Sequence, residues 1–414
     1  MKVLEINSHV SGSTGKIMFD IASELRENQI EVYTSSAVHR SENPVSSNQH
    51  IYISSILEKK IHNILRKYTG YNGVYSFYGT KKFIEKIDEI KPDVIHIHNI
   101  HSCYVNFKML FDYIKKTDIT VIWTLHDCWT FTGHCVYFDA VGCNQWMEGC
   151  KHCEHFDEYP ATKVNRAKEM YELKKRSFKC SNIKMLVTPS HWLASLAGRS
   201  FWEGTPIRVI NNGIDTSIFR PDENQIRQKF NLQDKFILLG VANPWTKRKG
   251  ADYILELHNR LDSDVYQIII VGSSGEEFGN RKGIIYVPRT ENQLQLAEYY
   301  SAADIFINPT IEDNFPTVNL EALACGTPVI TFNTGGSPES IDNSCGIVVP
   351  KYDMDAFEQA VRYCKTNNFD SDRCVFRSKS FTKEVQAANY LGLYKELLEC
   401  KGKNKSSGDM SREK

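Results

Sequence analysis

Asp313 and Glu321 are carboxylates on either side of a segment that carries the signals of a helix start. Pro316 suits the first helical turn, where its missing N–H would have no partner, and Gly326 suits the helix stop. A helix that begins there presents unpaired backbone amides, which attract anions such as phosphate. A carboxylate within the helix can accept two hydrogen bonds from a vicinal diol such as ribose. These features predict a nucleotide-sugar site, and the alternative is an ordinary capped helix with solvated acids.

The same stretch resembles the signature of the family 4 glycosyltransferases, E-x-F-G-x-x-x-x-E. Asp313, Phe315 and Glu321 occupy the positions of its first acid, its aromatic residue and its second acid. The first acid is Asp here, unless Glu312 takes its place by a shift of one residue, and Pro316 replaces the family's Gly. In the family the first acid meets the donor hexose and the second meets the ribose. The resemblance implies those roles here, with further donor contacts from Asn314, Phe315, Pro316, Thr317 and Val318.

Three cations, Lys247, Arg248 and Lys249, follow a strand predicted over residues 236–241. Cations beside backbone amides suit a diphosphate leaving group, whose negative charge grows as the glycosidic bond breaks. The alternative is a solvated basic turn. In family 4 an Arg five or six residues before the Lys shares this task, and Asn243 stands there in this chain. The resemblance therefore implies that Lys249, with Arg248, holds the diphosphate.

A glycine-rich turn that contains Gly12 and Gly15 follows a strand predicted over residues 3–6. It precedes a helix predicted to begin at Ile17, so its backbone can approach a phosphate or a sugar closely. A plain tight turn is the alternative. It is not a Walker A loop, because Ile17 rather than Ser or Thr follows the Gly-Lys pair. Family 4 enzymes carry a glycine-rich turn at this place that faces the donor and the acceptor.

His126 follows a strand predicted over residues 119–125, at the carboxyl end where ligands of parallel sheets bind. A histidine there can hydrogen-bond a substrate hydroxyl or take part in proton transfer, although a lone histidine also serves structural roles. Many family 4 enzymes have a histidine after this strand, near the donor sugar. The resemblance therefore implies a catalytic role for His126 beside Asp313.

Four cysteines within 19 residues end in a C-x2-C pair, and they are Cys135, Cys143, Cys150 and Cys153. Thiolates at such spacings can close a tetrahedral structural zinc site, in which His134, His152 or His155 are substitute ligands. A set of buried free thiols is the alternative. A similar cysteine-rich insert, here residues 133–155, occurs in family 4 enzymes of surface-polysaccharide pathways. No catalytic cofactor is expected.

The elements that position these residues alternate between strand and helix, which predicts doubly wound parallel α/β sheets. A chain of 414 residues is long enough for two domains. The family resemblance implies a GT-B fold, two Rossmann-like domains with the donor in the cleft between them. We expect an acceptor-side domain over residues 1–205, a donor domain over 206–380, a helix returning over 381–400 and a disordered tail over 401–414.

Fifty basic and fifty acidic residues cancel, so no global field favours nucleic acid. No signal peptide and no apolar run near 18 residues is recognisable, and these absences predict a cytoplasmic protein. One stretch, residues 56–67, sets apolar residues (Ile56, Leu57, Ile61, Ile64, Leu65) against Lys59, Lys60, Arg66 and Lys67. That pattern is typical of a surface helix, and the alternative is a helix lying on an anionic membrane.

The resemblance implies a metal-independent hexosyltransferase that retains anomeric configuration and uses a nucleotide-diphosphate sugar. The implied acceptor is a saccharide or an undecaprenyl-linked saccharide at the inner face of the cell membrane, in capsule, exopolysaccharide or O-antigen biosynthesis. One alternative is a non-catalytic protein that binds sugar nucleotides, and another is a GT-B nucleotide-sugar epimerase. A Rossmann dehydrogenase is disfavoured because no G-x-G-x-x-G follows a predicted strand.

Overall fold

The computed structural model describes residues 1–38, 45, 47–179 and 182–409, with side chains as far as residue 402. The chain forms two compact units. The N-terminal unit comprises Met1–Asn211 with Gln386–Lys414, and the C-terminal unit comprises Asn212–Val385. The sequence placed the change of domain between residues 205 and 206, and the chain enters its second unit at Asn212.

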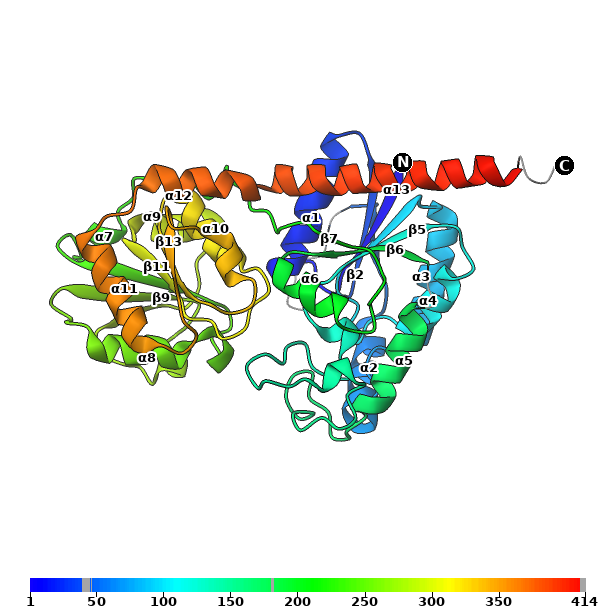
Figure 1. The fold of residues 1–414 in the computed structure, drawn as a ribbon, viewed down its shortest axis with the longest axis horizontal. Coiled ribbons are helices and arrows are strands. Elements are labelled where there is room, and N and C mark those ends of the chain that lie inside the picture. The colour runs from blue at the N-terminus through cyan, green and yellow to red at the C-terminus, as the bar shows by residue number, and fades with distance from the viewer. Residues whose placement is uncertain (39–44, 46, 180–181, 410–414) are drawn as a thin grey trace. The chain divides into compact units, whose positions relative to one another are not determined.

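The N-terminal unit is built on a seven-stranded sheet in the order β3-β2-β1-β4-β5-β6-β7, in which every neighbouring pair is parallel (Figure 1). Its strands are β1 Lys2–Ile6, β2 Glu31–Ser36, β3 His50–Tyr52, β4 Val94–Ile97, β5 Thr120–Thr124, β6 Ile183–Thr188 and β7 Ile207–Val209. The helices are α1 Gly12–Glu27, α2 Ile56–Thr69, α3 Phe77–Ile90, α4 Phe107–Ile114, α5 Ala167–Lys179 and α6 His191–Gly198. The predicted doubly wound arrangement is therefore present in this unit.

Both faces of this sheet are covered, which explains why its strands are almost continuously apolar. Alternate strand residues point to opposite faces, so Leu4 and Ile6 pack with helices α3, α4 and α5, whereas Val3 packs with α1. Glu5 shares the face of Val3, although it is a carboxylate with no exposed surface. That exception marks the polar network described below.

The helix after β1 begins earlier than predicted. The sequence placed its start at Ile17, but α1 starts at Gly12 with Ser11 as the N-cap residue. Gly12 has φ +73°, a conformation that favours glycine. A Cβ on Gly15 would lie 2.7 Å from the carbonyl carbon of Val10, so glycine lets the first helical turn pack against the loop before it. The backbone conformation thus accounts for Gly12, and close packing accounts for Gly15.

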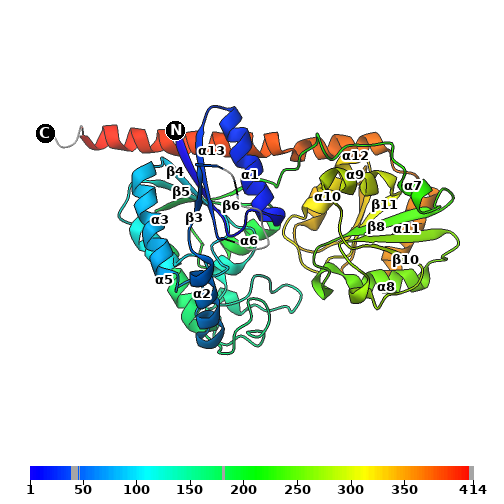
Figure 2. The same ribbon diagram turned by 180° about the vertical axis from the view of Figure 1, so that it is seen from behind.

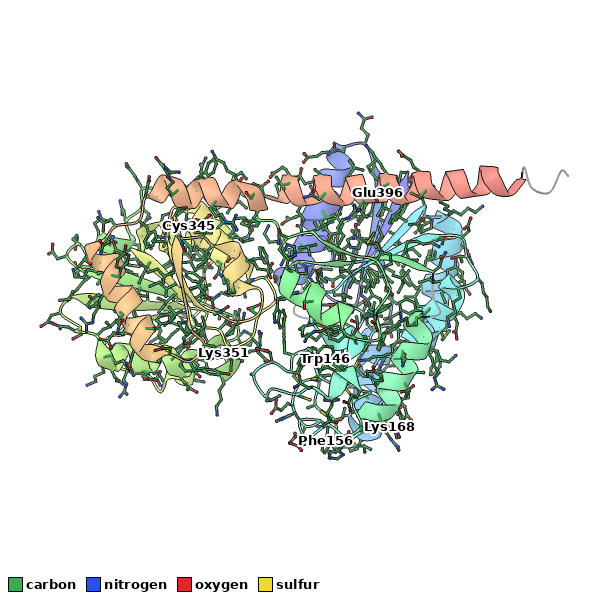
Figure 3. All side chains as sticks on the ribbon, viewed as in Figure 1. Trp146, Phe156, Lys168, Cys345, Lys351 and Glu396 are labelled. Atoms are coloured by element: carbon green, nitrogen blue, oxygen red, sulfur yellow. The ribbon has the colours of Figure 1, made fainter. Side chains whose placement is uncertain are left out.

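A long helix, α13, runs from Lys383 to Asp409 and enters the N-terminal unit at Gln386 (Figure 2). Tyr390, Leu393 and Tyr394 of this helix pack into the core beside α1. Arg208 donates two hydrogen bonds to Glu396, which Figure 3 labels, at 2.8 and 3.1 Å. The predicted disordered tail is wrong as far as Asp409, because an established helix propagates at little cost per residue. Residues 410–414 lie outside the described chain.

The C-terminal unit contains a second parallel sheet, in the order β10-β9-β8-β11-β12-β13. Its strands are β8 Phe236–Val241, β9 Tyr266–Val271, β10 Ile284–Val287, β11 Ile305–Asn308, β12 Val329–Phe332 and β13 Gly346–Val349. Its helices are α7 Ile226–Lys229, α8 Ala251–Arg260, α9 Gln293–Ala302, α10 Thr317–Ala324, α11 Met354–Thr366 and α12 Ser371–Ser378. Helices α9 and α10 pack on one face, and α8 and α11 on the other.

None of the helices in the described part of the chain is both long enough and apolar enough to cross a membrane.

Candidate active site

The predicted acid pair lies where β11 of the C-terminal unit ends and α10 begins. Asp313 is in the connecting loop, and Glu321 is in the second turn of α10. Pro316 is the N-cap residue and not the first helical residue, while Gly326 ends the helix with φ +80° as predicted. The N-cap residue itself, a proline, makes no side-chain hydrogen bond to the first-turn amides of α10. Backbone amides at a helix start suit an anionic ligand.

Lys249 and Asp313 form an ion pair in which Nζ lies 2.5 Å from Oδ2. Their side chains are 23% and 12% exposed, so water screens the pair only partly. Burial by itself would raise the pKa of Asp313, but Lys249 and Arg248 outweigh it and lower the pKa. Asp313 is therefore ionised at neutral pH and is a strong acceptor for a sugar hydroxyl.

The basic turn and the acid loop are locked to each other by backbone contacts. Arg248 donates from Nη1 to the carbonyl of Glu312 at 2.8 Å, and its own carbonyl accepts from the amide of Ile311 at 2.9 Å. Gly250 has φ +84°, and a Cβ there would lie 2.2 Å from the carbonyl oxygen of Pro309. The cations predicted to hold a diphosphate are thus fixed beside the loop predicted to hold the sugar.

The turn after β12 closes on the acid loop from the other side. A Cβ on Gly335 would lie 1.8 Å from the carbonyl oxygen of Asp313, and the amide of Gly336 donates to that oxygen at 3.1 Å. The Asp313 carboxylate accepts from the amide of Asn314 at 2.9 Å. Loops from three neighbouring strands, β8, β11 and β12, therefore converge at the carboxyl edge of this sheet.

Glu321 is 9% exposed, and its Oε2 accepts a hydrogen bond of 3.1 Å from the hydroxyl of Tyr300 on α9. Burial and the neighbouring Glu321 raise the pKa of Tyr300 well above its usual value, so the phenol remains a donor. This contact holds the carboxylate in one orientation. The sequence did not predict a role for Tyr300, because no local pattern connects it to an acid 21 positions later in the chain.

Phe315, the aromatic residue of the signature, is 3% exposed and packs against Phe381 at 5.5 Å between ring centroids. Its carbonyl accepts from Nδ2 of Asn212 at 3.0 Å, which anchors the loop at the start of this unit. Asn314 is likewise buried, whereas Thr317 and Val318 are half-buried. The donor contacts of these residues stay a prediction.

In the N-terminal unit, His126 follows β5 and lies at the end of a hydrogen-bonded chain. Its Nε2 is 2.9 Å from Nδ1 of His98, and Nε2 of His98 is 2.8 Å from Oε2 of Glu5. His98 and Glu5 are fully buried, and His126 is 8% exposed. The sequence predicted His126 but missed the two residues behind it. A carboxylate in apolar β1 and the His-x-His pattern of β4 are the signals that were available.

A second branch of the network ties Glu5 to α13. Nδ1 of His96 lies 2.8 Å from Oε2 of Glu5 and 2.7 Å from the hydroxyl of Tyr394. Tyr394 also donates to Oε1 of Glu5 at 3.2 Å, and Thr124 lies 2.8 Å from both Nε2 of His96 and the hydroxyl of Tyr390. Two strands and the returning helix are therefore joined through one carboxylate.

The charges in this network determine which nitrogens carry protons. Burial opposes ionisation of Glu5, but His96 and His98 outweigh it and lower its pKa to about 2. Burial lowers the pKa of His98 to about 4 and that of His126 well below its usual value. An ionised Glu5 only accepts, so we assign the proton of neutral His98 to Nε2 and that of His126 to Nε2. Nδ1 of His126 is then a hydrogen-bond acceptor.

Asp127, the neighbour of His126, connects the loop after β5 to the loop after β4. Its Oδ2 lies 2.9 Å from Nε2 of His101, and its Oδ1 accepts from the amide of Trp129 at 2.9 Å. The loops after these two adjacent strands are therefore held together at the carboxyl edge of the N-terminal sheet.

None of the four cysteines predicted to bind zinc forms a disulfide, and these are Cys135, Cys143, Cys150 and Cys153. Burial raises the pKa of Cys150 to about 11 and also raises that of Cys135, which neighbouring thiols raise further. Among the described residues, one group of three possible metal ligands has its ligand atoms within 4.8 Å of one another. It consists of Glu5, His96 and His98, which are already joined by hydrogen bonds. The thiols do not form such a group, so the zinc site stays a prediction.

Lys174 of α5 lies buried beside this cysteine-rich insert. Its ammonium donates to the carbonyls of Trp129 and Thr132 at 2.7 and 3.0 Å and lies 3.6 Å from the ring centroid of Trp129. These contacts fix the segment just before the insert to α5, and burial lowers the pKa of Lys174 to about 7.

Two family models match the chain. The model described as Glycosyltransferase Family 4 matches residues 14–218, and the model described as Glycosyl transferases group 1 matches residues 222–380. Together they cover both units, and the acid loop and the basic turn lie within the second match. The chain belongs to the family 4-like glycosyltransferases, which confirms the resemblance noted in the sequence.

A curated relative is WcaC of Escherichia coli K12, named as a colanic acid biosynthesis glycosyl transferase. It is 26% identical over 281 residues, which are 64% of this chain and 65% of the relative. The chain thus spans about two thirds of the relative's length.

Solved structures show the same fold. Sucrose-phosphate synthase from Thermosynechococcus elongatus matches with a TM-score of 0.72 at 17% identity, covering 96% of this chain and 99% of that chain. Anabaena HepE, solved in complex with UDP, matches with a TM-score of 0.67 at 13% identity, covering 96% and 100% of the two chains. These likenesses confirm the GT-B fold class predicted from the sequence.

Proposed function

We propose that the protein is a hexosyltransferase of polysaccharide biosynthesis that takes a hexose from a nucleotide-diphosphate sugar and retains its anomeric configuration. The observation that carries this proposal is the ion pair of Lys249 with Asp313 in the loop that leads into α10. This pair joins the residue predicted to bind the diphosphate to the residue predicted to bind the sugar. Both lie at one edge of the unit that matches the glycosyl transferase group 1 model. HepE, which has this fold, was also solved with UDP-glucose.

Each side chain then has a role that its surroundings support. Glu321, oriented by Tyr300, accepts hydrogen bonds from the ribose diol. Lys249 and Arg248, with the first amides of α10, neutralise the diphosphate as it departs. Asp313 is kept ionised by those same cations and accepts from a hexose hydroxyl.

The transfer needs no proton acceptor on the protein. The bond between the anomeric carbon and the diphosphate oxygen breaks, and the acceptor hydroxyl oxygen bonds to that carbon on the same face. The acceptor's proton passes to the leaving phosphate oxygen, whose basicity rises as the bond breaks. His126, neutral and with Nδ1 as an acceptor, receives a hydrogen bond from a hexose hydroxyl. We propose that this chemistry proceeds without a metal ion.

The first test is thermal unfolding with UDP, GDP, ADP and TDP, in the wild type and in Glu321→Ala. A ligand at 100 times its Kd adds about 2.7 kcal/mol of stability, which shifts the midpoint measurably. We expect one nucleotide to shift the wild type and to lose most of that shift in Glu321→Ala. Glu291→Ala is the matched control, because Glu291 is an exposed acid of the same unit. A shift unchanged in Glu321→Ala would remove the ribose assignment.

Turnover separates the proposed activity from its two alternatives. Nucleotide release that depends on an added saccharide acceptor supports the transferase. Isomerisation of the donor sugar without any acceptor would indicate an epimerase, and binding without turnover would indicate a non-catalytic sugar-nucleotide protein.

We also propose that the acceptor is lipid-linked and that α2 touches the inner face of the cell membrane. The buried residue of α2 is His62, Ile56 is half-buried, and the other large apolar residues are exposed. Leu57 is 67% exposed, Ile61 49%, Ile64 58%, Leu65 37% and Tyr68 57%. An ordinary surface helix buries its apolar face, so this arrangement favours the membrane alternative. The basic residues Lys60 and Lys67 of the same helix suit an anionic lipid surface.

Sedimentation with vesicles of phosphatidylglycerol and phosphatidylcholine tests the membrane contact. We expect Ile61→Ser with Ile64→Ser to reduce binding to these vesicles by about tenfold, because two large side chains leave the bilayer. Val141→Ser with Phe376→Ser is the matched control, since those residues are 50% and 68% exposed elsewhere. Equal loss in both variants would contradict a specific role for α2.

A further inference from the structure

A buried network of hydrogen bonds lies behind helix α10 in the C-terminal unit. Its centre is Asn319 of α10, which has no exposed surface. Oδ1 of Asn319 accepts from Nδ2 of Asn308, the last residue of β11, at 2.8 Å. Nδ2 of Asn319 donates to the hydroxyls of Ser337 and Ser340 at 3.0 Å each. Both serines belong to a short helical turn, η5 Ser337–Ser340, which follows β12, so one amide group joins α10 to the segments at the ends of two strands.

The network is closed, and the direction of each hydrogen bond follows from the others. Thr331 on β12 donates to the carbonyl of Asn308 at 2.9 Å, so the hydroxyl of Ser337, 2.8 Å away, donates to Thr331. Ser340 donates to the carbonyl of Ser337 at 2.7 Å. The two N–H groups of Asn319 then have the two serine oxygens as their acceptors. A buried network with its donors used in this way favours a single arrangement of the elements that it joins.

The apolar surroundings of α10 do not by themselves fix its rotation about its own axis. The residues from Asn319 to Ala324 are all buried, so the helix has no single apolar face that would select one orientation. Apolar contacts are also non-directional, whereas hydrogen bonds weaken steeply when their angle changes. The hydrogen bonds of Asn319 therefore determine how α10 is turned.

The position of Glu321 depends on that rotation. Glu321 follows Asn319 by two residues, or about 200° around the helix, so the two side chains leave α10 on nearly opposite sides. Side chains reach about 5–6 Å from a helix axis, and a rotation of about 10° therefore moves their ends by about 1 Å. A displacement of about 1 Å can reduce the rate of an enzyme about 100-fold.

The same amide group holds the turn that closes on Asp313. Ser337 directly follows Gly336, whose backbone amide donates to the carbonyl of Asp313 at 3.1 Å. The network is thus connected with both acids of the signature. Glu321 lies on the helix that Asn319 orients, and Asp313 lies in the loop that contacts the start of η5.

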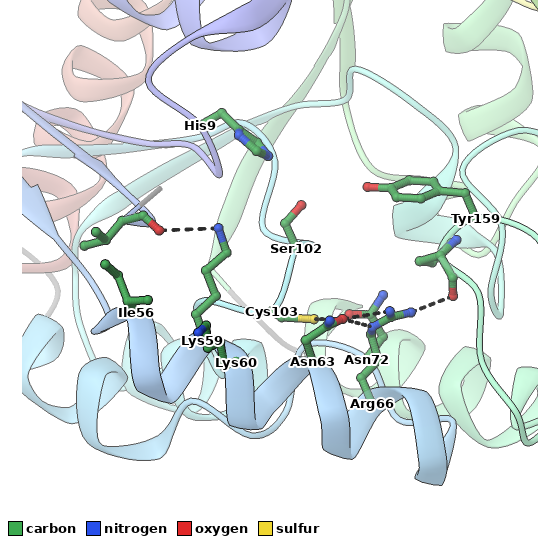
Figure 4. Close-up of a pocket in the computed structure, with 12 residues that line it drawn as sticks. His9, Ile56, Lys59, Lys60, Asn63, Arg66, Asn72, Ser102, Cys103 and Tyr159 are labelled. Atoms are coloured by element: carbon green, nitrogen blue, oxygen red, sulfur yellow. Dashed lines mark hydrogen bonds between the residues drawn. The ribbon is translucent and has the colours of Figure 1, made fainter. Parts of the chain in front are cut away.

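The network has no surface through which it could contact a substrate. Figure 4 shows a different case in the N-terminal unit, where Arg66 donates to the amide oxygen of Asn63 at 2.8 Å at the wall of a pocket of about 410 Å³. A molecule in that pocket would touch these side chains. Asn319, Ser337 and Ser340 have no exposed surface. They can act on a substrate only through the residues that they hold in place.

We propose that Asn319 is a positioning residue for the donor sugar nucleotide. Its amide group fixes the rotation of α10 and the place of η5, and it thereby sets the positions of the Glu321 and Asp313 carboxylates together. The inference rests on the proposed transferase function, because that function assigns the two acids to the donor. It adds that the ribose contact and the hexose contact are not independent of each other.

Nucleotide binding tests the proposal, with whichever of UDP, GDP, ADP and TDP stabilises the wild type most. Asn319→Leu keeps the approximate volume of the side chain and removes the amide group. We expect the Kd of this variant for the nucleotide, measured by calorimetry well below the unfolding midpoint, to rise about tenfold. Glu321→Ala should weaken binding at least about threefold less in Asn319→Leu than in the wild type, because the carboxylate is already displaced. Val361→Ala is the matched control, since Val361 is buried on α11 at the opposite face of the same sheet.

Two results would overturn the proposal. A purely structural role would lower the unfolding midpoint of Asn319→Leu and leave its Kd within about twofold of the wild type, as we expect for Val361→Ala. Independent effects, in which Glu321→Ala weakens binding by the same factor in both backgrounds, would also contradict it. Ser340→Ala removes one acceptor of Asn319 and serves where Asn319→Leu does not fold. It should raise the Kd about threefold, and an unchanged Kd would count against the proposal in the same way.

Hydrogen–deuterium exchange separates this proposal from the transferase function, because it needs no ligand. Backbone amides of residues 310–316 and 333–341 should exchange at least about tenfold faster in Asn319→Leu than in the wild type, and at the wild-type rate in Val361→Ala. Unchanged exchange in Asn319→Leu would mean that Asn319 does not fix the two acids. Failure of the wild type to bind any nucleotide would overturn the transferase assignment and leave the exchange result to decide the role of Asn319.

Discussion

Replacing Glu5 by Gln tests whether one buried carboxylate organises the N-terminal unit. The substitution keeps the size of the side chain but removes the charge that His96, His98 and Tyr394 share. The pKa of Glu5 falls from 4.5 to about 2 on folding, so the ionised form is favoured in the fold by about 3 kcal/mol at neutral pH. We therefore expect Glu5→Gln to lower the free energy of unfolding by about that amount.

The assay is urea unfolding at pH 7.5, followed by the fluorescence of the unit's buried tryptophans such as Trp123. Glu27→Gln is the matched control, because Glu27 is an exposed acid on α1. A folded-state pKa below the unfolded value stabilises the fold above pH 4.5, and this stabilisation disappears as the pH falls toward 2. The difference in the free energy of unfolding between wild type and variant should accordingly reach its full value at neutral pH.

The reasoning is refuted if Glu5→Gln is as stable as the wild type. That result would mean that the free-energy cost of desolvating the carboxylate equals the stabilisation from its three hydrogen bonds. Stability changes alone would not report on His126. Nitrogen-15 chemical shifts of its ring should also change in Glu5→Gln, because a glutamine amide can donate to His98 and reverse the tautomers along the chain.

Three further predictions concern the cations, acid stability and zinc. Lys249→Met should lower kcat/KM by about 100-fold or more, and it should weaken the binding of nucleoside diphosphates more than the binding of nucleosides. Equal weakening of both would contradict the diphosphate assignment. Burial holds His62 and His98 neutral with pKa values of about 3 and 4, so protons bind the unfolded chain first. The free energy of unfolding should therefore fall as the pH drops below 6.5, and His98 alone should contribute about 3 kcal/mol of that loss. A free energy of unfolding that does not change between pH 7 and 5 would contradict this. Purified protein should contain one equivalent of zinc, which substitution of the four cysteines by serine removes; metal-free wild type would refute the zinc prediction.

The sequence by itself determined the alternation of strands and helices and the place of the acid loop. Those features depend on local signals, such as the apolar runs of β8 and β11 and the proline and glycine on either side of α10. The family signature then identified Asp313 and Glu321 as candidates, and the end of a predicted strand identified His126. The predicted start of α1 and the predicted end of α13 were wrong, because packing determines where α1 begins and helix propagation determines where α13 ends.

The tertiary structure alone decided which residues act together. Lys249 meets Asp313, and Glu5 meets His98, because the crossovers of parallel sheets bring the ends of distant strands to one edge. Nothing local encodes such pairs, since they depend on the register of strands far apart in the chain. The same holds for α2, whose amphipathic pattern fits either orientation. Only packing showed that His62 is buried while Ile61 and Ile64 face outward.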